Sequence, residues 1–209
     1  MSSFGRSDEE LLKTGIFSDC QVRCDGKTWN LHKSILCGRS KYFMRWLVGD
    51  WPEAKAGIVE ITCFTAQQMD WIISWIYTGE FDFHSAEQNN TLLHTSVQLW
   101  TLGDYFLMQN LCSRAEREFR NLTWRARGAP YHPDRQDWLN AGRLIYTDYE
   151  DLDSTHSLKE RFLDLTLAKS WVRKQNLQMP EFKTLCQEHP KFGNDCMMKL
   201  VDDRISRLQ

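Results

Sequence analysis

The feature that most constrains the fold of this sequence is a pair of short alternating segments joined by a turn signal. Residues 20–24 read Cys-Gln-Val-Arg-Cys and residues 28–31 read Thr-Trp-Asn-Leu, so each places apolar side chains on one face of a strand. Asp25-Gly26 lies between them. An Asp-Gly pair tolerates the positive φ angles of a two-residue hairpin turn. The sequence therefore predicts an antiparallel β-hairpin over 20–31.

The apolar spacing changes from two residues to a helical period after this hairpin. Ser40 is suited to cap a helix that carries Phe43, Trp46 and Leu47 at spacings of three and four. Residues 58–61 read Ile-Val-Glu-Ile, which predicts a strand. A further short strand is predicted at 80–83.

The clearest helix signal covers residues 65–79. Thr65 and Gln68 have the Thr-x-x-Gln form of a capping box, and Gly79 stands where a glycine would end the helix. The apolar stripe of this helix consists of Met69, Ile72, Ile73 and Ile76. Two more helices are predicted at about 91–105 and 109–125.

The second half of the chain has only helical patterns, and a segment that breaks helices precedes it. Residues 127–133 read Arg-Gly-Ala-Pro-Tyr-His-Pro, and the glycine and two prolines interrupt any helix there. We therefore predict an α+β domain at 8–122, a linker at 123–133 and an all-helical extension at 134–209.

Charge and cysteine content narrow the class of protein. The formal net charge of −2 gives no overall attraction to nucleic acid or to an anionic membrane. Arg114, Arg117 and Arg120 recur on one face of a predicted helix. We interpret this face as solvent-exposed rather than as a nucleic-acid binding surface. The sequence has no run of about 18 apolar residues, so it predicts no membrane span. Seven cysteines without a secretory signal indicate reduced thiols in the cytoplasm or the nucleus.

Motifs for enzyme chemistry are not found. The sequence contains no Gly-x-Ser-x-Gly, His-Glu-x-x-His or phosphate-loop pattern. Cys186, His189 and Cys196 have a spacing that could supply three ligands to zinc. Thiols packed on either side of a turn are the interpretation we favour, because cysteine is often a small buried apolar residue. We expect no enzyme activity, no cofactor and no metal, with a thiol- or zinc-using protein as a remaining alternative.

Several short motifs of the first 120 residues resemble, in order and spacing, those of a BTB/POZ domain. They are Ser18-Asp19, the Asp25-Gly26 turn, Leu31-His32-Lys33, Ser40-Lys-Tyr-Phe43, Ile76-Tyr-Thr-Gly79 and Gly103-Asp-Tyr-Phe106. The resemblance covers about residues 8–122. It implies the BTB/POZ fold, a small sheet with a cluster of helices. Small BTB proteins of filamentous fungi are similar in length and Trp content, and some have helical tails.

The resemblance implies protein–protein association. BTB domains commonly homodimerise through the N-terminal helix and first strand, so the candidate dimer residues are Leu11, Leu12, Ile16 and Phe17. Asp19 and Lys33 match charged positions near a dimer groove that binds partners in some members. His32 lies beside them as a candidate partner-binding residue, although a structural hydrogen bond to backbone is its commoner role.

Many BTB proteins also dock a cullin scaffold as adaptors of a ubiquitin ligase. Such members carry a hydrophobic-x-acidic motif ahead of the helix that ends at Asp104-Tyr105. The aligned residues, His94-Thr95-Ser96, lack both required characters, and 85–87 supply an acid but no large apolar residue. An interaction module that homodimerises is therefore the first interpretation, and a cullin adaptor is the alternative.

The sequence has nine Trp, and two of them raise a separate question. Trp71 and Trp75 repeat at i, i+4 on a second face of the 65–79 helix. A helix with apolar residues on two faces must cover both. The second face is either the seat of the helical tail, with Trp138 and Trp171, or an exposed patch for a partner.

Overall fold

The structure is a computed structural model, and it describes residues 3–89, 91–128, 134–147, 156–167, 174 and 176–206. The chain forms two compact units. Residues Met1–Asp82 and Thr101–Cys112 make the first, and residues Phe83–Trp100 and Ser113–Gln209 make the second. Each unit is described by itself.

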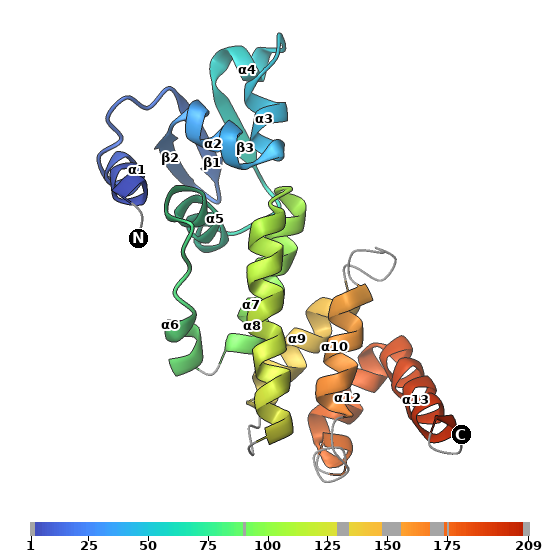
Figure 1. The fold of residues 1–209 in the computed structure, drawn as a ribbon. Helices are drawn as coiled ribbons and strands as arrows, with labels where there is room; N and C mark the ends of the chain where they lie inside the picture. Colours follow the sequence, from blue (N-terminus) through green and yellow to red (C-terminus); the bar gives the residue numbers. More distant parts are fainter. Residues whose placement is uncertain are drawn as a thin grey trace. The chain divides into compact units, whose positions relative to one another are not determined.

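The first unit is built from a small sheet and short helices (Figure 1). Its elements are α1 (Ser3–Thr14), β1 (Cys20–Cys24), β2 (Lys27–Leu31), α2 (Lys33–Arg39), α3 (Lys41–Leu47), α4 (Pro52–Ala56), β3 (Ile58–Ile61) and α5 (Ala66–Thr78). The strand order is β2-β1-β3. Strand β1 runs antiparallel to β2, with Val22 opposite Trp29, and parallel to β3, with Val22 opposite Val59.

The predicted hairpin is confirmed, with its turn at Asp25 and Gly26. Their φ angles are 49° and 73°, which is the left-handed backbone that an Asp-Gly pair tolerates. The inward-facing side chains of β1 and β2 are buried, whereas Arg23 and Asn30 are exposed. One face of this hairpin therefore lies on the core of the first unit.

Helix α5 has the two ends that its sequence predicts. The Thr65 hydroxyl accepts the Gln68 N–H at 3.3 Å, and the Gln68 side chain accepts the Thr65 N–H at 3.0 Å. At the other end Gly79 has φ 70° and donates its N–H to the Trp75 carbonyl at 2.8 Å.

The predicted strand at 80–83 is wrong. Residues 80–82 have no regular structure, and α6 begins at Phe83. The rings of Phe81 and Trp71 pack edge to face, with their centroids 5.5 Å apart.

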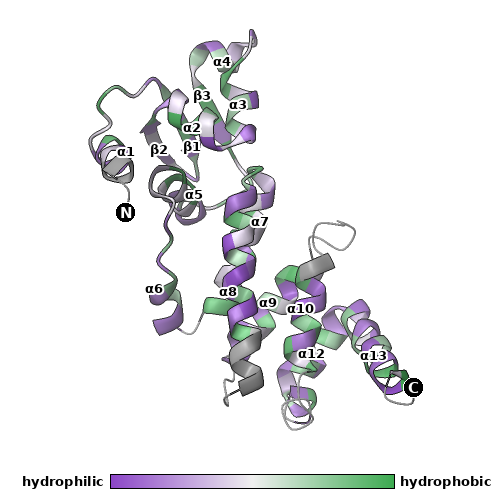
Figure 2. Ribbon diagram, viewed as in Figure 1, coloured by the Kyte–Doolittle hydropathy of each residue, from purple (hydrophilic) through white to green (hydrophobic). Residues whose placement is uncertain are grey.

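The second unit is helical in the part of the chain that the structure describes. Its elements are α6 (Phe83–Gln88), most of α7 (Leu92–Tyr105) and α8 (Gln109–Gly128), then α9 (Arg135–Thr147), α10 (His156–Thr166), α12 (Pro180–Glu188) and α13 (Pro190–Ile205). Figure 2 shows hydrophobic and hydrophilic residues alternating along α10, α12 and α13, as amphipathic helices require.

An aromatic cluster forms the core of the second unit. Trp138 is fully buried, stacks on Phe162 at 5.2 Å between ring centroids and meets Phe192 at 5.9 Å. The indole N–H of Trp138 donates to the Thr166 hydroxyl at 3.2 Å, which satisfies its one polar atom. Ion pairs join the helices around this core: Arg161 with Glu116, Arg143 with Glu188, and Lys199 with Asp164.

The domain boundary predicted at residue 122 falls within a continuous helix. Helix α8 runs to Gly128, so it includes 123–128 of the predicted linker, and 129–133 lie outside the described residues. Residues 83–100 and 113–122 belong to the same compact unit as the C-terminal helices. The boundaries of the domain at 8–122 stay a prediction.

Candidate functional site

A tight turn follows α1 and carries two of the predicted dimer residues. The Ser18 N–H donates to the Gly15 carbonyl at 3.1 Å, which closes the turn. Phe17 occupies its third position with φ 65°, where glycine is usually found. The Phe17 side chain is 84% exposed and that of Ile16 is 53% exposed. An apolar side chain thus stands in solvent on strained backbone.

The other two predicted dimer residues lie on α1. Leu11 and Leu12 are half-buried. Asp8 on the same helix forms an ion pair with Arg39, which also donates to the Tyr77 carbonyl at 3.2 Å. These contacts hold α1 against α5. The segment from Leu11 to Phe17 therefore combines a fixed helix with an exposed apolar end.

His32 connects this turn to the core. Its side chain is 5% exposed, Nε2 lies 2.7 Å from the Ile16 carbonyl oxygen, and Nδ1 lies 2.7 Å from the Tyr77 hydroxyl. The His32 backbone N–H donates to the same hydroxyl at 3.0 Å. Burial raises the pKa of Tyr77 to about 12, so the phenol stays protonated. In this single chain His32 makes structural hydrogen bonds and presents no surface to a partner.

Asp19 and Lys33 are held by backbone groups of the first unit. A carboxylate oxygen of Asp19 accepts the Lys33 N–H at 2.7 Å, and the Lys33 ammonium donates to the Ala54 carbonyl at 3.1 Å. Gly57 makes this approach possible, since a Cβ there would lie 3.2 Å from the Asp19 carbonyl oxygen. The pair ties the start of β1 to α2 and α4. Its predicted role in partner binding stays a prediction.

Trp71 and Trp75 leave little open surface. Trp75 is 8% exposed, and its indole N–H has no hydrogen-bond partner among the described residues. Trp71 is half-buried against Phe81. This face, for which a seat of the helical tail and an exposed patch were the two alternatives, is therefore mostly covered in this chain. Of the two tail residues in that question, Trp171 lies outside the described residues.

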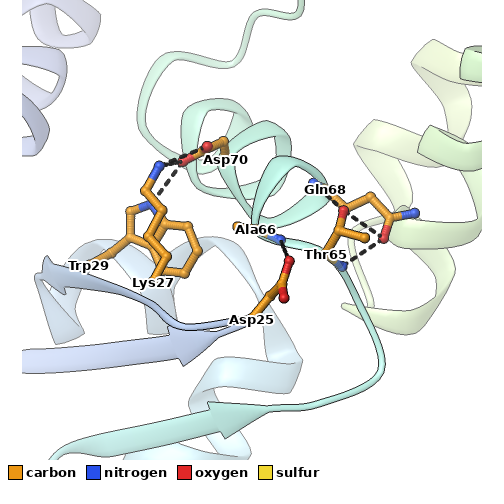
Figure 3. Close-up of polar contacts among 7 residues, drawn as sticks. All are labelled: Asp25, Lys27, Trp29, Thr65, Ala66, Gln68 and Asp70. Carbon is orange, nitrogen blue, oxygen red and sulfur yellow. Dashed lines mark hydrogen bonds and ion pairs between the residues drawn. The ribbon is translucent and has the colours of Figure 1, made fainter.

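A polar cluster fastens the hairpin to α5 (Figure 3). The Asp70 carboxylate accepts from the Lys27 ammonium at 2.7 and 2.8 Å and from the Trp29 indole at 2.8 Å. Asp25 accepts the Ala66 N–H at 3.2 Å, beside the capping box. These contacts are exposed, and they position β2 against α5.

A second exposed apolar surface was not anticipated from the sequence. We call it the α3 surface, and its members are the half-buried Tyr42 and the exposed Trp46, Trp51 and Tyr105. The expected buried stripe of α3 included Trp46, but only Phe43 and Leu47 are buried and Trp46 is 43% exposed. The Tyr42 ring lies 6.3 Å from Trp46 and 5.3 Å from Tyr105. Helix α3 has only seven residues and cannot bury all of its large side chains. This excess of large side chains is the sequence signal that could have revealed the α3 surface.

Cys186, His189 and Cys196 do not form a three-ligand group. No three His, Cys, Asp or Glu side chains among the described residues are placed to hold a metal ion. Burial raises the pKa of the Cys196 thiol to about 12 and also raises that of Cys186. Neither thiol is therefore activated as a nucleophile.

Among the residues that the structure describes, no helix has the length and apolar content that a bilayer crossing requires.

The fold and the sequence together define the class of protein. The BTB/POZ domain family matches residues 9–121, more than half of the chain, and the chain belongs to this family. The predicted α+β BTB/POZ fold is confirmed. BTB domains are interaction modules, so membership of this family implies protein–protein interaction.

Relatives of known name share only this domain. Mouse Kelch-like protein 3 is 29% identical over 103 residues, which are 49% of this chain and 17% of that protein. Human Kelch-like protein 24 is 28% identical over 105 residues, 50% of this chain and 17% of that protein. The BTB domain of zebrafish PATZ1 is a structural neighbour, with a TM-score of 0.45 and 17% identity over 56% of this chain and 88% of that one.

Proposed function

We propose that this protein is a non-enzymatic interaction module that homodimerises through α1 and the turn that follows it. The observation that carries the proposal is Phe17, an exposed aromatic residue at a positive φ. Such backbone costs about 1–3 kcal/mol for a residue other than glycine. Exposure and strain at one residue make sense if its side chain is buried in a second copy. The seven cysteines support a reducing compartment, the cytoplasm or the nucleus, as the location of this module.

The surroundings of Phe17 suit an isologous interface. Ile16 extends the exposed apolar surface, and Leu11 and Leu12 are half-buried behind it. Glu9 and Lys13 form an ion pair at 2.7 Å on the same helix, which supplies a polar rim. A stable interface buries about 800 Å² from each partner, so α1 must contribute along its length.

Light scattering coupled to size exclusion tests the dimer. We expect twice the chain mass for the wild type and the single mass for Phe17→Asp. Met197→Asp is the matched control, because Met197 is also an exposed apolar residue (65%) and lies on α13 of the second unit. A wild type that stays monomeric at micromolar concentration contradicts the proposal.

A second candidate function is docking of a cullin scaffold through the α3 surface. Exposed Trp and Tyr side chains are typical anchors of protein interfaces. Trp51, a member of this surface, begins the sequence Trp51-Pro52-Glu53, which has the hydrophobic-x-acidic form, although at another place than the aligned one. Lys41 and Arg45 on α3 are exposed and pair with no acid that the structure describes.

Co-purification with a cullin N-terminal domain distinguishes this function. If the α3 surface docks a cullin, the wild type retains it and Trp46→Asp loses it, while Met197→Asp behaves as wild type. If neither the wild type nor any variant retains the cullin at high concentration, the adaptor function is ruled out and the homodimeric module remains.

A further inference from the structure

His32 has every polar atom of its ring engaged, and the partners fix its tautomer. The Ile16 carbonyl oxygen can only accept, so Nε2 carries the proton and donates to it at 2.7 Å. Nδ1 then accepts from the Tyr77 hydroxyl at 2.7 Å, and the oxygen of that hydroxyl accepts the His32 N–H at 3.0 Å. The ring is therefore a link of fixed orientation between α5 and the turn after α1.

The Ile16 carbonyl oxygen, which accepts from His32, controls the direction of the Phe17 side chain. The Ile16 carbonyl belongs to the peptide plane that precedes the Cα of Phe17. The Ser18 N–H on the other side of Phe17 is held by the Gly15 carbonyl, so holding both peptide planes constrains the φ of Phe17, which is 65°. A residue other than glycine leaves this conformation unless its surroundings hold it. The strain at Phe17 is comparable to the net stabilisation from one buried hydrogen bond.

We propose that His32 is a positioning residue that presents Phe17 to a second copy of this chain. The inference rests on the proposed function, because it assigns the control of the same dimer surface. His32 itself stays buried and touches no partner. Its substitution releases the Ile16 carbonyl, the turn relaxes, and the Phe17 side chain leaves the direction required for pairing.

The dissociation constant of the dimer is the readout that separates positioning from stability. Both copies must present Phe17, so the apparent constant rises with the inverse square of the competent fraction. A fall of that fraction to about one third weakens the dimer about tenfold. We expect this loss for His32→Phe, which keeps a buried ring and removes the Nε2 donor, measured by sedimentation of the full chain.

Ser40→Ala is the matched control within the same unit. The Ser40 hydroxyl is buried and donates to the Phe106 carbonyl at 2.7 Å, away from the turn. Its loss lowers the melting temperature to a similar extent without changing the dissociation constant. Tyr77→Phe is a second variant that keeps a buried ring and removes only the hydroxyl. It leaves the Nε2 bond in place and weakens the dimer less, about threefold.

The outcomes distinguish this inference from the proposed function. A dimeric wild type with a weakened His32→Phe dimer and an unchanged Ser40→Ala dimer supports positioning. If His32→Phe and Tyr77→Phe lower the melting temperature but keep the wild-type dissociation constant, His32 is only structural and the inference is overturned. A monomeric wild type overturns the proposed function, and the inference falls with it.

Discussion

The carboxylate of Asp137 on α9 accepts the backbone N–H of His94 on α7 at 2.8 Å. Its other oxygen accepts the N–H of Leu93 at 2.9 Å, and the residue is 4% exposed. N–H groups in the first turn of a helix have no partner within that helix. Asp137 therefore completes the start of α7, a helix of the BTB sequence match, from a residue beyond that match. The C-terminal helices are a structural part of the unit they join.

Removing the Asp137 side chain tests this joint. We expect Asp137→Ala to lower the free energy of unfolding by about 1–3 kcal/mol, because two buried N–H groups lose their acceptor. Asp137→Asn keeps an accepting oxygen and should stay within about 1 kcal/mol of the wild type. Urea unfolding followed by circular dichroism measures both. Equal losses in the two variants would contradict a role as acceptor.

The same carboxyl should make stability depend on pH. Burial raises the pKa of Asp137 to about 6, above its usual value, so the folded state binds the proton more readily than the unfolded chain. The stabilisation is thus complete below about pH 4 and is lost as the pH rises towards 6. Compared with Asp137→Asn, the wild type should lose about 1–2 kcal/mol across this range.

The Asn variant is also the control for the neighbouring histidine. Burial lowers the pKa of His94, which contributes its own pH dependence to both proteins. The difference between the two unfolding curves removes that contribution. A difference that is flat from pH 4 to 7 would mean that Asp137 does not titrate in this range.

Trp75 provides a test of the covered face of α5. Because it is buried, Trp75→Ala should cost about 3–5 kcal/mol of unfolding free energy. Trp75→Phe removes the unpaired indole N–H and keeps an aromatic ring, so its cost should be smaller, about 1 kcal/mol. Thermal unfolding gives the stabilities, and light scattering gives the association. Loss of association by Trp75→Phe at wild-type stability would instead indicate a docking role.

The parts of the fold that the sequence predicted are set by neighbouring residues. The Asp25-Gly26 turn depends on two positive φ angles, and the ends of α5 depend on Thr65, Gln68 and Gly79. Each signal and its structure lie within a few residues of one another. The strand expected at 80–83 failed for the opposite reason. A strand needs a partner, and the sheet that the structure describes consists of β1, β2 and β3, so that segment pairs with none of them.

The site depended on contacts between distant parts of the chain, which residue patterns do not contain. Ile16 and Phe17 were predicted from the family resemblance. The contacts that hold them were not, because His32 is 16 residues from Ile16 and Tyr77 is 45 residues beyond His32. The exposure of Trp46 was missed because its spacing matches that of buried Phe43 and Leu47. A period of three and four places side chains on one face but does not say how wide the covered face is.

Replacing Phe17 with glycine tests the central claim most directly, because the claim predicts opposite effects on folding and on association. Glycine adopts a φ of 65° without strain, so the folded monomer of Phe17→Gly should be as stable as the wild type or more stable by about 0.5–1 kcal/mol. Light scattering should show a wild-type dimer and a monomeric variant at the same concentration. A Phe17→Gly protein that dimerises as tightly as the wild type would contradict the account.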